Sequence, residues 1–165
     1  RLPMVSAILD AEIPVMGHLG LTPQSIHALG GYKVQGRPPA VAAALVEDAV
    51  ALAAAGCFCI VLEAIPSTLA REITATVAVP TIGIGAGPWC DGQVLVFHDL
   101  LGLEDRIMAT FVRRYASLKA DSVAALAEFA GDVRARRFPT EAESYSDRPA
   151  GAGRTDHRPG GSKSA

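Results

Sequence analysis

The chain has 165 residues, enough for one domain with a sizeable core, and its 50% hydrophobic and 19% charged content excludes disorder for most of its length. A formal net charge of −2 gives no electrostatic indication of nucleic-acid binding. The long uncharged runs are shorter than the roughly 20 residues of a membrane-spanning helix or are broken by Pro and Gly, which excludes a transmembrane segment.

Helical and strand patterns alternate along the chain. Helices are predicted where apolar residues recur at helical spacing, and strands where apolar, β-branched runs are bounded by Pro and Gly. The strongest helix is the alanine-rich run before Gly56, and Ser67 is the predicted cap of the helix that follows the next strand. In chain order we predict helices over 4–11, 22–30, 39–55, 67–77, 105–115 and 122–136, and strands over 13–19, 57–65, 79–84 and 93–97.

Strands separated by helices are typical of a parallel α/β fold. We expect the four strands to lie parallel and adjacent in chain order, with the helices on the outer face. A closed (β/α)₈ barrel needs eight strands and about 250 residues, so the pattern fits either a small open sheet or part of a barrel. The composition changes at Ser146, and residues 146–165, rich in Gly, Pro and Arg, are predicted to form a disordered tail after a folded domain over 1–145.

The three cysteines, Cys57, Cys59 and Cys90, form neither an even-numbered framework nor a C-x-x-C pair. They are predicted to be buried thiols in a reducing compartment, the cytoplasm, rather than metal ligands. The chain opens with Arg1 instead of Met, inside a sequence that already has the pattern of a folded domain, which indicates a truncated protein.

Glu63 is the most informative residue, because it is the only charge between Asp48 and Arg71 and lies near the end of the predicted strand 57–65. Functional groups of parallel α/β folds gather at the carboxyl ends of strands. Apolar neighbours desolvate a carboxylate and disfavour its charged form, which suits a general base that abstracts a proton next to a carbonyl. The alternative interpretation is a structural carboxylate that pairs with an arginine or caps a helix.

His18 holds the corresponding place on the first strand, between two glycines that allow a ligand or another strand to approach closely. A structural role for this histidine is the alternative. His27, His98 and His157 have no partner at metal-ligand spacing, and the adjacent His98 and Asp99 are a weak indication of a dyad.

The glycine run over 83–87 is consistent with an anion-binding turn after a barrel strand, although it matches neither the dinucleotide fingerprint nor the P-loop. A tight strand-to-loop turn with close packing is the favoured alternative. No Ser-His-Asp, zinc-ligand or paired-carboxylate arrangement is visible in the sequence.

Three segments closely resemble ketopantoate hydroxymethyltransferases: GHLGLTPQSIHALGGYKVQGR (17–37), VLEAIP (61–66) and PTIGIGAGPWCDGQVLVFHDLLGL (80–103). The resemblance extends to about Tyr145. It implies the second half, about four βα units, of a (β/α)₈ TIM barrel of the phosphoenolpyruvate-mutase-like group.

The resemblance further implies transfer of a hydroxymethyl group from 5,10-methylenetetrahydrofolate to 3-methyl-2-oxobutanoate, giving 2-dehydropantoate for pantothenate and coenzyme A synthesis. By position in the family motifs, Glu63 is the catalytic residue that takes or relays the proton, and His18 lines the substrate site. The family uses Mg²⁺, whose ligands belong to the first four strands, so no metal ligand is expected in this chain. The family also forms homo-oligomers, usually decamers, and neither nucleic acid nor membrane is an expected partner.

Two features depart from the family pattern: Glu143 stands where the family usually has histidine, and the tail beyond Ser146 is extra. Two alternatives to an active enzyme half remain. The chain could be an inactive remnant that serves in assembly, or a half-barrel that binds phosphorylated metabolites through the glycine run over 83–87.

Overall fold

The computed structural model describes residues 2–22, 24, 31, 33–104 and 109–145. The chain divides into two units, Arg1–Lys119 and Ala120–Ala165, and each is described by itself. The predicted helix over 22–30 falls mainly, and the predicted tail over 146–165 wholly, outside the described residues.

The first unit contains a parallel sheet of four strands in the order β1-β2-β3-β4. The predicted direction and neighbours of the four strands are therefore confirmed. The register places Gly20 beside Glu63 and Glu63 beside Ile84, so the carboxyl ends of the first three strands lie together. The strands are β1 (Met16–Gly20), β2 (Cys59–Glu63), β3 (Thr81–Ile84) and β4 (Gly92–Gln93).

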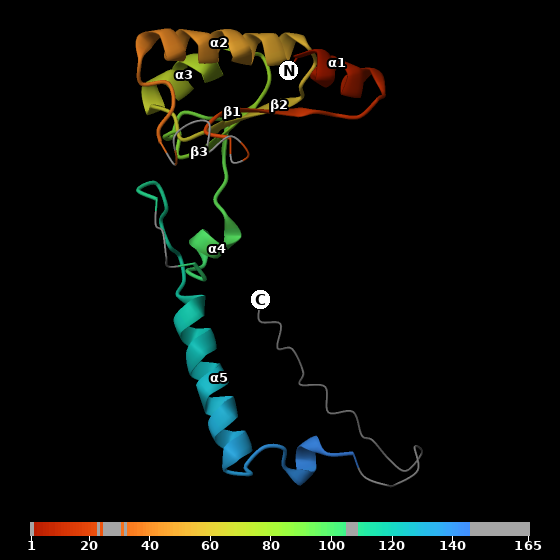
Figure 1. Ribbon diagram of the computed structural model, residues 1–165, viewed down its shortest axis with the longest axis vertical. Coiled ribbons are helices and arrows are strands. Elements are labelled where there is room, and N and C mark those ends of the chain that lie inside the picture. The colour runs from red at the N-terminus through yellow and green to blue at the C-terminus, as the bar shows by residue number, and fades with distance from the viewer. Residues whose placement is uncertain (1, 23, 25–30, 32, 105–108, 146–165) are drawn as a thin grey trace, which may run out of the picture. The chain divides into compact units, whose positions relative to one another are not determined.

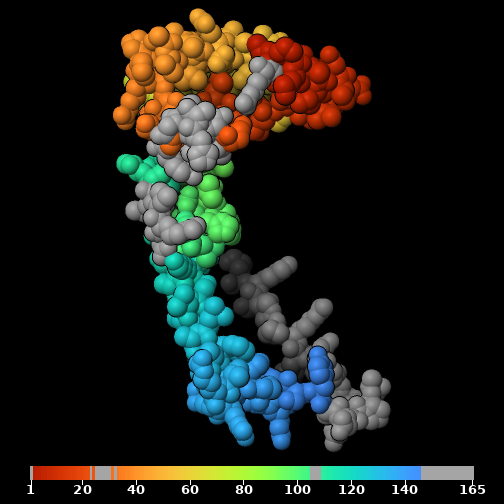
Figure 2. Space-filling view, viewed as in Figure 1, coloured from red at the N-terminus to blue at the C-terminus, as the bar shows by residue number. Residues whose placement is uncertain are grey.

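Three helices confirm the predictions for this unit: α1 (Leu2–Asp10), α2 (Pro39–Ala54) and α3 (Ser67–Thr76). Helices α2 and α3 lie on the same side of the sheet (Figure 1). Figure 2 shows α1 and α2 next to each other at the surface of this unit. The prediction that Ser67 caps α3 is wrong, because Pro66 holds the cap position and Ser67 is the first helical residue. The ring of Pro66 fixes its φ, which presets the direction in which the chain enters the helix. No side chain forms a cap hydrogen bond there.

The core lies between the sheet and these two helices. Ile60 and Leu62 of β2 are fully buried, as are Ala49 of α2 and Ile73 of α3. Successive side chains of a strand point to opposite faces, so Val61 and Glu63 lie on the other face of β2, where both are only partly buried. One face of the sheet is thus closed by helices, and the other carries the side chains of His18 and Glu63.

The chain after β3 differs from the predictions. The predicted strand over 93–97 is shorter, because α4 (Phe97–Leu100) begins within it. The predicted helix over 105–115 is wrong for its described residues, 109–115, which form a turn, a bend and irregular backbone. The physical reason is that the backbone N–H of Tyr115 donates to Leu100 O, 2.8 Å away, instead of to a carbonyl four residues earlier.

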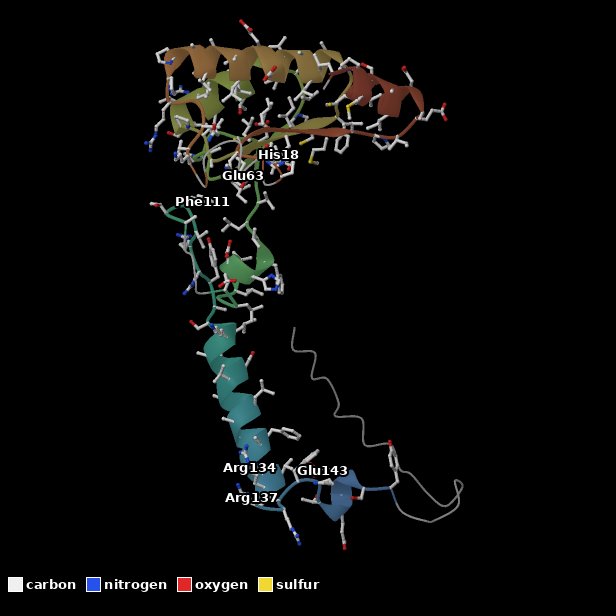
Figure 3. All side chains as sticks on the ribbon, viewed as in Figure 1. His18, Glu63, Phe111, Arg134, Arg137 and Glu143 are labelled. Atoms are coloured by element: carbon white, nitrogen blue, oxygen red, sulfur yellow. The ribbon has the colours of Figure 1, made fainter. Side chains whose placement is uncertain are left out.

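Helix α5 (Leu118–Arg134) runs from the last residues of the first unit into the second and confirms the helix predicted over 122–136. The second unit also contains the 3₁₀ helix η2 (Glu141–Glu143), where Thr140 N donates to Glu143 Oε2 at 2.8 Å in a capping box. Glu143, labelled in Figure 3, thus has a local structural role. None of the helices in the described ranges combines the length and apolar character that crossing a membrane requires.

Candidate functional site

The structure brings His18 and Glu63 into direct contact on the partly exposed face of the sheet (Figure 3). His18 lies in the middle of β1 opposite Val61, and Glu63 is two residues further along β2, so both side chains lie on one face. His18 Nε2 lies 3.0 Å from Glu63 Oε2. Two residues that sequence analysis singled out separately therefore form a hydrogen-bonded pair.

The contact of this pair uses one of the two carboxylate oxygens of Glu63. A carboxylate only accepts hydrogen bonds, so His18 donates to Oε2 through its Nε2–H. The side chains of His18 and Glu63 are 34% and 17% exposed, respectively. Within the described ranges, His18 is the residue whose side chain bonds the Glu63 carboxylate, and it contacts Oε2 and not Oε1.

Backbone hydrogen bonds hold the end of β2 on both sides. Leu21 N donates to Glu63 O at 2.9 Å, and Ala64 N donates to Ile84 O at 2.9 Å. Gln35 N donates to Ala64 O at 2.8 Å. Ala64 has a φ of +50°, a left-handed conformation that non-glycine residues rarely adopt. The carboxylate therefore stands on a tightly fixed turn, and nothing in the sequence marks Ala64 for this role.

The glycine run over 83–87 forms a closely packed turn at the adjacent strand end. A Cβ on Gly85, which has a φ of +64°, would lie 2.6 Å from Phe111 Cδ1. A Cβ on Gly87 would lie 2.3 Å from Ser67 Cβ. Protein side chains thus occupy the space beside both glycines, in agreement with the packing interpretation. Sequence analysis missed Phe111, because a single phenylalanine far along the chain carries no signal of this contact.

A second polar cluster lies at the opposite end of β3. Asp91 Oδ2 accepts hydrogen bonds from Thr81 N at 2.8 Å and from Thr81 Oγ1 at 3.1 Å. These bonds hold the pKa of Asp91 below its ordinary value of 3.8. The Oγ1 atoms of Thr74 and Thr81 are 2.8 Å apart. This cluster fastens the loop between β3 and β4 at the amino end of the sheet, a position that contributes to stability in parallel α/β folds.

The cysteines are free thiols. Cys57 and Cys59 are buried as predicted, whereas Cys90 is half-buried. Burial raises the pKa of the Cys57 and Cys90 thiols. A high pKa keeps these groups protonated and unreactive at neutral pH.

Metal-binding side chains do not gather in the part of the chain that the structure describes: no three His, Cys, Asp or Glu side chains lie close enough to hold an ion. His98 lies in α4 with its ring edge-to-face with Phe97, at a centroid distance of 5.9 Å. His27 and His157 lie outside the described residues. The described residues therefore do not by themselves fit a Mg²⁺ ion.

Comparison with known proteins identifies the relatives of this chain. Residues 1–141 match the family described as ketopantoate hydroxymethyltransferase. A 3-methyl-2-oxobutanoate hydroxymethyltransferase of Methylobacterium sp. (strain 4-46) is 60% identical over 146 residues, which are 88% of this chain and 51% of the relative. Proteins of the same name from Moorella thermoacetica and Oleidesulfovibrio alaskensis are 57% and 56% identical over 87% of this chain, and the matches cover 53% and 50% of those relatives. The chain spans about half the length of the curated relatives it matches, and by name these relatives are transferases.

Proposed function

Because this chain belongs to the ketopantoate hydroxymethyltransferase family, we propose that it supplies the carboxyl-terminal half of an enzyme that makes 2-dehydropantoate. The reaction transfers a hydroxymethyl group from 5,10-methylenetetrahydrofolate to 3-methyl-2-oxobutanoate, in pantothenate biosynthesis. The observation that carries the proposal is the contact of His18 Nε2 with Glu63 Oε2 at the carboxyl end of β2. The names of the relatives support the reaction class.

The chemistry assigned to Glu63 is removal of the proton from C3 of the keto acid. The C3–H bond breaks, its proton goes to Oε1 of Glu63, and its electron pair forms the C2=C3 bond of an enolate with the negative charge on the C2 oxygen. C3 then forms the new carbon–carbon bond to the methylene carbon of the folate. The two carbon–nitrogen bonds of that carbon break, water supplies the hydroxyl oxygen, and tetrahydrofolate leaves with protons on both nitrogens. His18 donates to Oε2 and so fixes the orientation of the carboxylate during proton transfer.

The rest of the active site belongs, in this proposal, to sequence outside this chain. Mg²⁺ would stabilise the charge on the enolate oxygen. Since the described residues do not fit the ion, its ligands would come from the amino-terminal half of the barrel. The same half would contribute the four further strands of a (β/α)₈ barrel, and the complete enzyme would act as a homo-oligomer in the cytoplasm. Residues 146–165 would follow this domain as a tail without a catalytic role.

The proposal is tested with a joined protein that consists of the amino-terminal half of the Methylobacterium relative followed by this whole chain. Exchange of the C3 hydrogen of 3-methyl-2-oxobutanoate for deuterium in D₂O reports proton removal without the folate. We expect exchange at a rate close to that of the intact relative, which serves as the positive control. A folded joined protein that catalyses neither exchange nor 2-dehydropantoate formation would contradict the proposal and favour the inactive remnant.

A further inference from the structure

Phe111 lies against the strand end that neighbours Glu63 (Figure 3). Glu63 pairs in register with Ile84, the last residue of β3, and Gly85 comes next. Paired strands lie about 4.8 Å apart, so a group that covers Gly85 lies next to the carboxyl end of β2. The ring of Phe111 is that group, because a Cβ added to Gly85 would meet three of its ring atoms at 2.6–2.9 Å.

Hydrogen bonds fix the segment that carries Phe111 just after that residue. Tyr115 N donates to Leu100 O at 2.8 Å, and Arg114 Nη2 donates to Glu104 O at 2.6 Å. These bonds tie residues 114–115 to α4 and the residues that follow it, while Phe111 reaches the sheet. Phe111 is 40% exposed although its contact with Gly85 is tight, so part of its apolar surface remains uncovered near this end of the sheet.

We propose that Phe111 is a specificity-determining residue whose ring packs against the methyl groups at C3 of the keto acid. The inference rests on the proposed function and extends it to the choice of substrate. A keto acid whose C3 faces Glu63 needs an apolar surface beside that carbon, since C3 of 3-methyl-2-oxobutanoate carries two methyl groups. One methyl group in an apolar pocket changes substrate discrimination by about 10–200-fold, so the ring is sufficient to select the branched acid.

The test compares two keto acids in the joined protein: 3-methyl-2-oxobutanoate and 2-oxobutanoate, which has one methyl group fewer at C3. For each acid, kcat/KM for deuterium exchange at C3 is measured, and the ratio of the two values is the readout. We expect Phe111→Ala to lower the preference for the branched acid by about tenfold. Gly85→Ala should lower it in the same direction, because the new Cβ displaces the ring while Phe111 itself is unchanged.

Phe58→Ala is the matched control. Phe58 is 51% exposed and lies immediately before β2, at the amino end of the sheet, so its loss should leave the ratio unchanged. A purely structural role for Phe111 would lower both exchange rates together, so an unchanged ratio in Phe111→Ala overturns the inference. If that variant does not fold, an unchanged ratio in Gly85→Ala has the same meaning. Absence of exchange in the unsubstituted joined protein would contradict the proposed function and this inference with it.

Discussion

At the scale of single residues, the contact of His18 with Glu63 fixes a carboxylate in the place where two neighbouring strands end. The 3.0 Å bond uses one oxygen of Glu63, and the backbone bonds of Glu63 and Ala64 hold the strand end itself. A base that is already oriented does not have to lose side-chain freedom during the reaction. This arrangement therefore supports the proton abstraction that we propose for Glu63.

Replacement of Glu63 by Gln is expected to lower deuterium exchange at C3 in the joined protein by about 10²–10⁴-fold. Glutamine keeps the shape of the side chain and can accept a hydrogen bond from His18, but it cannot take up the proton. Keto-acid binding, measured by calorimetry, should change little. Glu72→Gln, at an exposed position on α3, is the control and should leave exchange unaltered. An exchange rate in Glu63→Gln equal to that of the parent would remove Glu63 from the role of base.

Asp91 gives a prediction for stability. Hydrogen bonds from Thr81 lower its pKa in the folded protein, so its contribution to stability is complete above the ordinary value of 3.8 and is lost as the pH falls through the folded pKa. Asp91→Ala should therefore lower the thermal midpoint of the joined protein at pH 6, and the difference from the parent should shrink at pH values below about 3.8. A difference that stays constant or grows toward acid pH would show that Asp91 acts by another route.

At the scale of secondary structure, the sequence predicts what depends on local pattern. The apolar run before Glu63 corresponds to β2, whose composition reflects its burial. The alanine-rich run before Gly56 corresponds to α2, because alanine has the highest helix propensity. The residues after β4 were predicted less well. Their conformation depends on long-range bonds such as Tyr115 N to Leu100 O, which no local pattern encodes.

The same distinction applies to the candidate site. His18 and Glu63 could be singled out because each is an isolated polar residue in an apolar strand. Their contact, the left-handed turn at Ala64 and the position of Phe111 over Gly85 depend on strand register and on segments distant in sequence. Such features become visible only in three dimensions.

Glycine substitutions can test whether the close approach of β1 to β2 at Gly20 contributes to stability. Gly20 has a φ of +89°, and a Cβ there would lie 2.2 Å from Glu63 O. Gly20→Ala should therefore destabilise the joined protein by more than the roughly 1–2 kcal/mol of a left-handed alanine, and should also displace the strand end that carries Glu63.

Gly31→Ala is the matched control for this substitution. Its φ is +101°, but a Cβ there would meet none of the described residues within 4 Å, so we expect the conformational penalty alone. Urea unfolding of the two variants separates the effects. Equal destabilisation would show that the close approach of Gly20 to Glu63 O does not matter.

At the scale of the whole molecule, the described residues leave one face of the sheet only partly covered. Ile60 and Leu62 are fully buried beneath the helices, whereas Val61, Ile82 and Ile84 on the opposite face are only partly buried by the described residues. Parallel sheets are normally covered on both faces. The relatives are about twice as long as this chain, and in the proposed barrel the amino-terminal half would supply that cover.

Exposed strand edges and an uncovered apolar face favour association or loose packing when this chain is alone. We therefore expect the isolated chain to self-associate or aggregate, as measured by size-exclusion chromatography. The amino-terminal half of the Methylobacterium relative, added in trans during refolding, should suppress this association. Equal association with and without that half would contradict the role assigned to the uncovered face.

The central claim is that this chain supplies the proton-abstracting residue of a barrel whose other half lies outside it. Complementation with that other half tests this claim most directly. The chain is purified alone and is also refolded together with the separately produced amino-terminal half of the Methylobacterium relative. Deuterium exchange at C3 of 3-methyl-2-oxobutanoate is then measured. The account predicts no exchange by either half alone, exchange by the mixture, and loss of that exchange when the chain carries Glu63→Gln. Exchange by the lone chain, or undiminished exchange by the mixture that contains Glu63→Gln, would contradict it.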